Sequence, residues 1–294
     1  MSSMGTGYQS SGCGLFLSTT RSARSSGFVL GPGTSVADGR FTLEGLLGEG
    51  AFGLVYRAYD RCRRTDIALK FVCKIPDAPA QTILENELTI QSRITDFAYV
   101  IRAFDLHPVD YAGHSASVLS MELAPGGPFS DWLDLYRRDQ TARLSQGLHL
   151  FEQMCLGVRA YHRSGVAHLD LHPGNFVFSA NGALKLTDSG CARYLGPSGY
   201  RAYSRWRLSG GGLGAPEFRA PELWRAPADC AGDKSSDVYS LGSLAYLLFS
   251  RDCRPPFVGT QEDLRHGHLY LEPPPLTGVP RDIARVVARC LSKL

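Results

Sequence analysis

Apolar and polar positions alternate along much of the chain between residues 41 and 123, and this alternation predicts strands. Side chains on one face of a strand recur at every second position, and the runs here are bounded by glycine or polar residues. Helical spacing interrupts the alternation once, near 80–94. We therefore expect a small mixed lobe with that helix and with strands near 41–47, 53–59, 66–73, 99–106 and 116–123.

Helical spacing dominates the chain beyond residue 125. Apolar residues recur at intervals of three and four from Leu148 to Tyr161, which predicts an amphipathic helix that ends near Gly165. The apolar run 238–249 is too short to span a bilayer and predicts a buried helix. A last amphipathic helix is expected from Ile283, Val286, Val287, Cys290 and Leu291. The predicted fold class is α+β, with a β-rich lobe at about 41–121 and a larger helical lobe at about 125–294.

The first forty residues differ from the rest in composition. Serine and glycine dominate them, and the first acidic residue is Asp38. A stretch of this kind buries little apolar surface, so we expect residues 1–40 to form a disordered tail.

Charge and cysteine content narrow the class of protein. The chain has 294 residues, of which 44% are hydrophobic, and this is enough for a large core. The net charge of +3 is too small to indicate nucleic acid or a membrane as a partner. Eight cysteines are scattered without a C-x-x-C pair, so neither a metal site nor a disulfide framework is predicted. A reducing compartment, the cytoplasm, is the expected location.

A polar segment at 168–175 offers candidate chemistry. It places Asp170 and Asn175 five residues apart, and Asp188 follows before a glycine. Carboxylate and amide oxygens are ligands that suit magnesium, and a remaining carboxylate can accept a proton from a hydroxyl group. On its own, the same cluster would equally fit a solvated polar loop.

Two further motifs lie upstream of this segment. Residues 47–56 carry three glycines with the spacing G-x-G-x-x-G, which lets a backbone approach phosphates closely but also occurs in ordinary hairpins. The next predicted strand contains Lys70, and a buried cation is costly without an anion beside it. Glu87 in the predicted helix offers that anion, with Glu85 as the rival partner.

These motifs, in this order, resemble the eukaryotic-type protein kinase family. The resemblance continues through Gly214–Glu222, Ser236–Gly242 and Pro255–Phe257, and it covers about residues 41–294. It implies a bilobal protein-kinase-like fold, ATP and magnesium as cofactors, and a protein substrate. The family also has helices beyond the position of Leu294, so we expect a kinase domain that is incomplete at its C-terminus.

The resemblance also implies roles for individual residues. Lys70 would hold the α- and β-phosphates and Glu87 would orient it, while Asn175 and Asp188 would ligate magnesium. Asp170 would orient the acceptor hydroxyl and accept its proton, with His172 as a further catalytic residue. Met121 would close the adenine pocket beside the backbone of Glu122 and Ala124. The full set implied for the nucleotide is Leu47, Gly48, Gly50, Gly53, Val55, Ala68, Lys70, Met121, Glu122, Ala124 and Val177.

Several positions depart from the family pattern near the catalytic loop. Leu169 stands where the family usually has arginine, so a phosphate on the activation segment loses its usual partner. His172 replaces the lysine of serine/threonine kinases and Ala215 replaces a threonine, which removes two hydrogen-bond donors near Asp170.

Other departures concern the interior. Ser189 replaces the usual phenylalanine after the metal-binding aspartate, and Gln91 stands at an apolar position of the same internal stack. A hydrogen bond between Gln91 and Ser189 is one hypothesis for what replaces that apolar contact. Glu222 is expected to lack the arginine that pairs with it in the family.

Three functions remain open at this point. The first is an ATP-dependent protein kinase, with serine or threonine favoured over tyrosine as acceptor, and we favour it because all five catalytic groups are present. The second is a pseudokinase that acts as a nucleotide-binding regulatory or scaffold module. The third is a small-molecule kinase, because the loop at 170–175 also resembles that of aminoglycoside-phosphotransferase-like and ABC1-like enzymes, which lack the segment Ala220–Glu222. The sequence does not indicate an oligomeric state.

Overall fold

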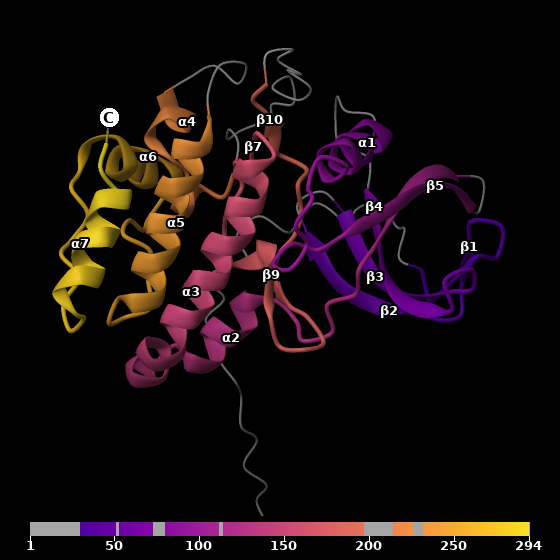
Figure 1. Cartoon of the computed structure of the whole chain (residues 1–294), viewed down its shortest axis with the longest axis horizontal. Coiled ribbons are helices and arrows are strands. Elements are labelled where there is room, and N and C mark those ends of the chain that lie inside the picture. The colour runs from indigo at the N-terminus through magenta and orange to yellow at the C-terminus, as the bar shows by residue number, and fades with distance from the viewer. Residues whose placement is uncertain are drawn as a thin grey trace, which may run out of the picture.

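The computed structural model describes residues 30–50, 53–72, 80–111, 114–196, 214–225 and 232–293. Two lobes lie side by side, a smaller one built on a sheet and a larger one built of helices (Figure 1). The fold is therefore of the predicted α+β class.

The smaller lobe is a six-stranded antiparallel sheet with one helix against it. The sheet has the order β1-β2-β3-β4-β6-β5. Its elements are β1 (Ser35–Val36), β2 (Phe41–Gly50), β3 (Gly53–Asp60), β4 (Thr65–Val72), α1 (Ala80–Gln91), β5 (Ala103–Tyr111) and β6 (His114–Met121).

The alternation along β4 decides where Lys70 points. Ile67, Leu69 and Phe71 belong to one apolar cluster of the lobe. Ala68 and Val72 belong to another, which includes residues of α1. Lys70 has the same parity as this second set, and successive side chains of a strand point to opposite faces, so its side chain faces α1.

Two expectations for this lobe need correction. Residues 30–40 were expected to be part of a disordered tail, but β1 pairs with β2, and Leu30 and Val36 are buried in the sheet's core. These two apolar residues add enough contact to order the segment, although its overall composition is polar. Residues 1–29 lie outside the described part of the chain. The fourth predicted strand, 99–106, instead runs from Ala103 to Tyr111 as β5, after a single bridge between Val100 and Leu186.

The larger lobe is organised around two long helices, α3 (Gln140–Arg163) and α5 (Lys234–Phe249). Nearly all of α5 is buried, which confirms the core helix predicted from the apolar run at 238–249. Its remaining helices are α2 (Phe129–Tyr136), α4 (Pro221–Arg225), α6 (Gln261–Tyr270) and α7 (Arg281–Cys290). Two short strand pairs, β7 (Val166–Ala167) with β10 (Arg193–Tyr194) and β8 (Phe176–Phe178) with β9 (Leu184–Leu186), frame the loops between the lobes.

The predicted apolar faces of two helices are partly wrong. In α3 the buried stripe runs through Leu150, Met154 and Val158, while Leu148 is half exposed, because the face that packs against α5 and β9 is rotated from the predicted one. In α7 Val287 is buried and Val286 is exposed, since adjacent helical residues face different directions. Within the described ranges, no helix has the length and apolar character needed to cross a bilayer.

Candidate active site

Lys70 lies at the centre of a buried charge cluster between the lobes. Its Nζ is 2.8 Å from Glu87 Oε2 on α1 and 2.8 Å from Asp188 Oδ1 in the segment after β9. Burial favours the neutral amine, but the two carboxylates outweigh burial and hold the pKa of Lys70 above its usual value. Lys70 therefore stays charged although only 4% of it is exposed. Glu85, the rival partner on the same helix, is exposed.

Asp188 is held in a strained and well-defined position. Its backbone has a φ of 59°, which is uncommon for a residue other than glycine, and its Oδ1 also accepts a hydrogen bond of 3.2 Å from the Gly190 N–H. Burial alone would raise the pKa of Asp188, but the charge of Lys70 and the Gly190 hydrogen bond lower it. The group is thus an ionised carboxylate whose second oxygen is left for another ligand.

The loop at 168–175 is anchored by Asp237, which lies near the start of α5. Asp237 is fully buried, and its two carboxylate oxygens accept hydrogen bonds of 2.8 Å from the backbone N–H groups of His168 and Leu169. His162 adds a contact of 2.8 Å to Oδ2. Leu169 adopts a φ of 64°, and this strained backbone persists because the carboxylate fixes both adjacent N–H groups.

This anchoring role of Asp237 was missed by the sequence analysis. The one available signal was its position, since it is the acidic residue at the start of an otherwise apolar helix. A carboxylate buried there needs several donors, and backbone N–H groups of a neighbouring loop can supply them.

Asp170 accepts hydrogen bonds from two other residues. Its Oδ1 accepts a hydrogen bond of 3.1 Å from the Ala215 N–H, and its backbone carbonyl accepts one of 2.7 Å from Asn175 Nδ2. The turn that brings Ala215 there requires glycine, because Gly214 has a φ of 79° and a Cβ on it would lie 2.9 Å from the Leu169 carbonyl oxygen. Backbone thus replaces the side-chain donor that Ala215 lacks.

His172 lies beside Asp170 with a defined tautomer when neutral. The Gly174 N–H donates to Nδ1 over 3.2 Å, so the ring proton resides on Nε2. Nε2 is 3.7 Å from Asp170 Oδ1, which is too long for a direct hydrogen bond. The imidazole N–H is therefore directed toward the same space as the carboxylate.

Asn175 and Asp188 have a donor set that fits magnesium. Because the Asn175 amide nitrogen is committed to the Asp170 carbonyl, its Oδ1 is the atom left for a ligand. Amide and carboxylate oxygens are suitable for Mg²⁺, which usually takes only one or two protein ligands when phosphate oxygens complete its shell. No group of three or more His, Cys, Asp or Glu side chains arranged for a metal occurs in the described residues, so a site independent of phosphate has no support.

Apolar residues expected at the purine form one cluster. Ala68, Met121, Val55, Ala124 and Val177 belong to it, and they come from both lobes. Leu47 is half exposed at the edge of β2. The Glu122 N–H donates to the Arg102 carbonyl over 2.9 Å, so of its two backbone groups the carbonyl is the one left for a ligand.

The glycine motif spans the turn from β2 to β3. A Cβ on Gly48 would meet nothing within 4 Å, whereas a Cβ on Gly53 would lie 1.8 Å from the Phe71 carbonyl oxygen. Gly53 is therefore required by strand packing, whereas a Cβ at Gly48 would meet no described atom. Gly50 pairs with Gly53 in the ladder, and Ala51 and Phe52 lie outside the described residues.

The hypothesis of a bond between Gln91 and Ser189 is wrong. Gln91 Nε2 donates to the Tyr161 hydroxyl over 3.3 Å, and its Oε1 accepts from the Ala103 N–H over 3.4 Å. The side chain of Gln91 is therefore satisfied by α3 and β5, while the Ser189 N–H contacts Glu87. Glu222, which was expected to lack the arginine that pairs with it in the family, accepts a hydrogen bond from the Ser236 hydroxyl.

Comparison with known proteins agrees with this geometry. A family model described as "Protein kinase domain" matches residues 41–292. The chain is 31% identical over 271 residues to the DNA damage-responsive serine/threonine-protein kinase RqkA of Deinococcus radiodurans, covering 90% of this chain and 38% of that protein. It is 27% identical over 259 residues to the serine/threonine-protein kinase drp72 of Corynebacterium efficiens, covering 86% and 47%. Cyclin-dependent kinase 20 of Mus musculus is 30% identical over 215 residues, covering 70% and 55%. The chain thus spans roughly half the length of these relatives, or less.

Proposed function

The chain belongs to the protein kinase family, and on this premise we propose that it transfers the γ-phosphoryl group of ATP to a hydroxyl group of a protein. The observation that carries the proposal is the position of Lys70, which bridges a carboxylate of each lobe at 2.8 Å. A cation in this position binds phosphate oxygens, and the carboxylates keep it charged and oriented.

The roles of the other residues follow from their contacts. When bound, Mg²⁺ neutralises charge on the phosphates, and Asn175 Oδ1 and Asp188 are the atoms of this chain that would hold it. Asp170 orients the acceptor hydroxyl and accepts its proton, since its carboxylate is fixed by the Ala215 N–H and is otherwise available. His172 directs its Nε2–H toward the same space and supports either the carboxylate or a phosphate oxygen.

Serine or threonine is the proposed acceptor, and a protein is the proposed substrate. Both are supported by the relatives, whose names describe serine/threonine-protein kinases. Control by a phosphate on the activation segment has no support at Leu169, because its side chain is buried against apolar atoms near Leu223. A cation at that position would be needed to bind such a phosphate.

The test compares label transfer with nucleotide binding. Transfer from γ-labelled ATP to a generic acceptor protein is measured for the wild type, Asp170→Asn and Asp188→Ala, together with the thermal shift caused by Mg²⁺ and ATP. We expect Asp170→Asn to keep the thermal shift and to lose transfer by about 10³-fold, since it removes only the proton acceptor. Asp188→Ala should lose both, because it removes a metal ligand.

Asp282→Asn is the matched control, since Asp282 is an exposed carboxylate on α7 far from Lys70. Equal transfer by the wild type and Asp170→Asn would refute the catalytic role. A wild type with a thermal shift but without transfer to any protein would identify a pseudokinase, and transfer to small molecules alone would identify a small-molecule kinase.

A further inference from the structure

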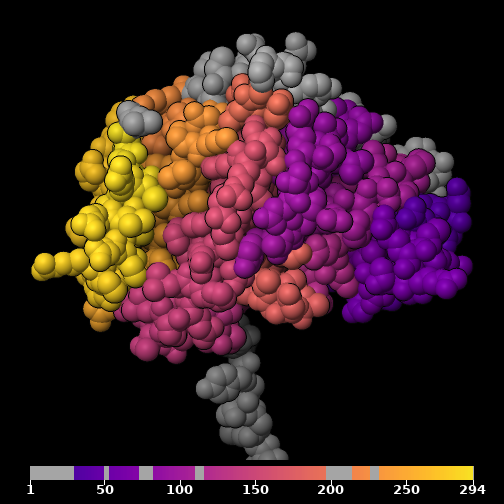
Figure 2. All heavy atoms as spheres, in the orientation of Figure 1, coloured from indigo at the N-terminus to yellow at the C-terminus, as the bar shows by residue number. Residues whose placement is uncertain are grey.

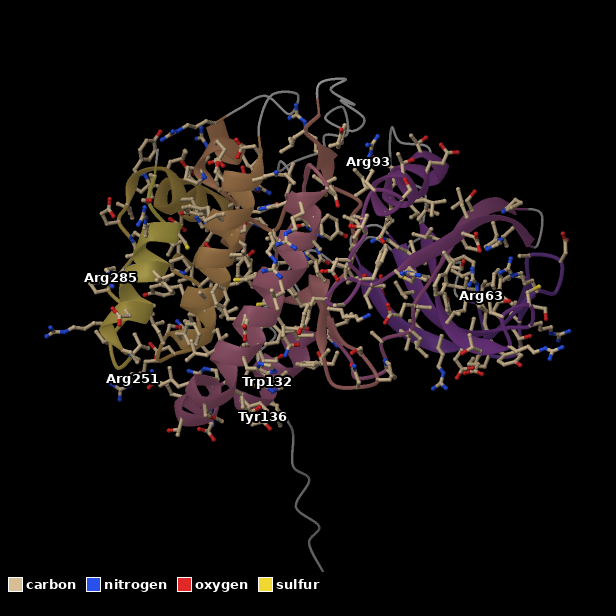
Figure 3. All side chains as sticks on the ribbon, viewed as in Figure 1. Arg63, Arg93, Trp132, Tyr136, Arg251 and Arg285 are labelled. Atoms are coloured by element: carbon tan, nitrogen blue, oxygen red, sulfur yellow. The ribbon has the colours of Figure 1, made fainter. Side chains whose placement is uncertain are left out.

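A second site of concentrated charge lies at the far end of the helical lobe. A cavity of about 650 Å³ is lined there by Arg137, Arg138, Gln140, Arg251, Asp252 and Arg254. Four arginines against one aspartate give this lining a net charge of +3. Arg251 projects from the lower end of this lobe in Figure 3, a region that lies at the lower left of the space-filling view in Figure 2.

The cavity is remote from the candidate active site. Helix α3 has 24 residues, and a rise of 1.5 Å per residue makes it about 36 Å long. The cavity lies at its beginning, whereas His168 and Asp170 follow its end. Helix α5 runs the opposite way, from Asp237 under the loop at 168–175 to the cavity at its C-terminal end. The two sites are therefore joined by the two core helices.

Arg143 fixes the two walls of the cavity relative to each other. It is fully buried on α3, and its guanidinium donates to carbonyl oxygens of both walls. These acceptors belong to Tyr136 and Arg137 on one side, and to Leu248, Ser250 and Arg251 on the other. A planar group with several donors holds such carbonyls in one arrangement. The positions of Arg137 and Arg251 are thus set by the interior of the protein.

The loop that carries Arg251 and Arg254 is rigid for a second reason. The Ser250 hydroxyl donates to the Arg254 carbonyl over 3.0 Å and accepts from the Arg254 N–H over 3.0 Å. Cys253 is buried and has a φ of 49°, an uncommon backbone state for a residue with a Cβ. Strain of this kind persists only where the surroundings enforce it. The arginines are therefore presented from a preorganised loop.

Free hydrogen-bonding capacity faces the cavity. For the guanidinium groups of Arg138, Arg251 and Arg254 the described part of the chain provides neither an ion pair nor a hydrogen bond. Gln140 Nε2 is buried and likewise has no acceptor among the described residues. Arg137 is paired with Asp134. Several donors thus line one volume, and among the described residues none of them is paired with Asp252, the carboxylate of the same lining.

We infer that this arginine cavity binds a phosphoryl group carried by a protein segment. Guanidinium groups match phosphate oxygens in pairs, and a dianion neutralises most of the charge of the lining. The carboxylate of Asp252 can accept a hydrogen bond from a peptide N–H group. It would repel a nucleic acid, which carries a negative charge on every nucleotide. The lining also has no aromatic side chain of the kind on which single-stranded nucleic acids stack. The site is independent of the function proposed above.

The test measures binding of a short labelled peptide by fluorescence polarisation. A phosphoserine peptide without basic residues is compared with its serine counterpart at 150 mM salt. Mg²⁺ and ADP are present in excess to occupy the candidate active site. We expect the phosphopeptide to bind at least tenfold more tightly than the serine peptide. The double variant Arg251→Gln/Arg254→Gln should reduce its affinity at least tenfold, and transfer to a generic substrate should not change.

Arg285→Gln is the matched control, because Arg285 is an exposed arginine on the outer face of α7 outside the cavity (Figure 3). It should leave phosphopeptide binding unchanged. If the double variant unfolds, Arg138→Gln on the opposite wall replaces it. Equal binding of both peptides, or equal loss in the Arg285 variant, would overturn the inference. Binding of inorganic phosphate alone, or tighter binding of an RNA oligonucleotide lost in the double variant, would also overturn it.

Discussion

Lys70, between the lobes, and Arg143, at the far end of the helical lobe, are two buried cations whose surroundings differ in kind. Lys70 forms ion pairs with carboxylates on α1 and after β9. Arg143 donates to five backbone carbonyl oxygens, and no ion pair is recorded for it within the described residues. Both side chains lose their hydration, which is costly for any charge. For Lys70 this cost is offset by the opposite charges of two carboxylates, and for Arg143 it is offset by the fixed dipoles of backbone carbonyl groups.

The difference separates a group that can exchange partners from one that cannot. An ammonium group is a compact charge with three donors on one atom, so it can bind a phosphate oxygen while it stays near its carboxylates. The guanidinium of Arg143 is divided among carbonyls whose positions are set by helix ends and a rigid loop. Lys70 is therefore suited to binding a phosphate, and Arg143 is suited to fixing the backbone segments around it.

The largest effect is expected from Lys70→Met. This change removes the cation that would contact the phosphates, so label transfer should fall by about 10³-fold. The free energy of unfolding should be affected less than label transfer, because the two carboxylates that remain can share a proton. Lys234→Met is the control, since Lys234 is exposed at the start of α5. Transfer within twofold of the wild type would show that Lys70 is a structural cation like Arg143 and would break the comparison.

The opposite pattern is expected for Arg143→Lys. The charge is kept, but a single ammonium cannot reach carbonyls on both walls of the cavity, so several buried acceptors lose their donor. We expect the free energy of unfolding to fall by about 2–4 kcal/mol, measured by urea denaturation. Transfer per folded molecule should be unchanged. Arg138→Lys, at an exposed position between α2 and α3, should change stability by less than about 0.5 kcal/mol. Equal stability of the two variants would refute the role given to Arg143.

The contrast also shows what sequence reasoning can reach. Lys70 and Glu87 were proposed as a pair because a strand position and a helix position could each be assigned from local periodicity. The roles of Arg143 and Asp237 could not be proposed in this way. Three of the five carbonyl groups that bind Arg143, and both N–H groups that bind Asp237, lie about 70 to 110 residues away, and backbone atoms carry no sequence signal.

Average composition is a poor guide to the order of residues 30–40. Residues 30–40 are polar overall, yet the pairing of β1 with β2 and the buried side chains of Leu30 and Val36 attach them to the sheet. The same limit applies to Gln91, whose partner Tyr161 was assigned to a helix face without a contact. Fold class and candidate catalytic groups followed from motif order, whereas the contacts that stabilise them depend on tertiary packing.

A third test measures how stability depends on pH, and it concerns a buried histidine of the helical lobe. His268 on α6 is fully buried among Trp224, Tyr239 and Phe257, with Arg219 and Lys293 nearby. Burial and these cations lower the pKa of His268 to about 3, while an unfolded histidine titrates near 6.5. Below pH 6.5 the unfolded chain therefore binds a proton that the folded protein does not, so stability is lost as the pH falls.

This loss should reach about 2 kcal/mol at pH 5, at about 1.4 kcal/mol per pH unit, and urea denaturation at pH 5 and 7.5 measures it. His268→Asn keeps an acceptor for Tyr239 and should flatten the dependence, whereas His266→Asn, on the exposed side of the same helix, should not. Asp188 contributes at lower pH, because its pKa is lowered from a value that is already near 4. An unchanged slope in His268→Asn would assign the acid sensitivity elsewhere.

The smallest effect is expected from a change at His172, which lies beside Asp170 in the candidate active site. Its Nε2–H faces Asp170 from 3.7 Å, and its Nδ1 is held by the Gly174 N–H. Because Asp170 keeps its bond from Ala215, His172→Ala should leave the carboxylate in place and remove one supporting donor. We expect kcat to fall about tenfold with KM for ATP nearly unchanged, as for loss of one hydrogen bond to a charged group. His172→Lys restores a donor at this position and should recover most of the rate, while His149→Ala on the exposed face of α3 is the control. An equal fall of kcat in the lysine variant would mean that His172 shapes the turn at Gly174. Asp170 would then be held by backbone hydrogen bonds alone, as Arg143 is.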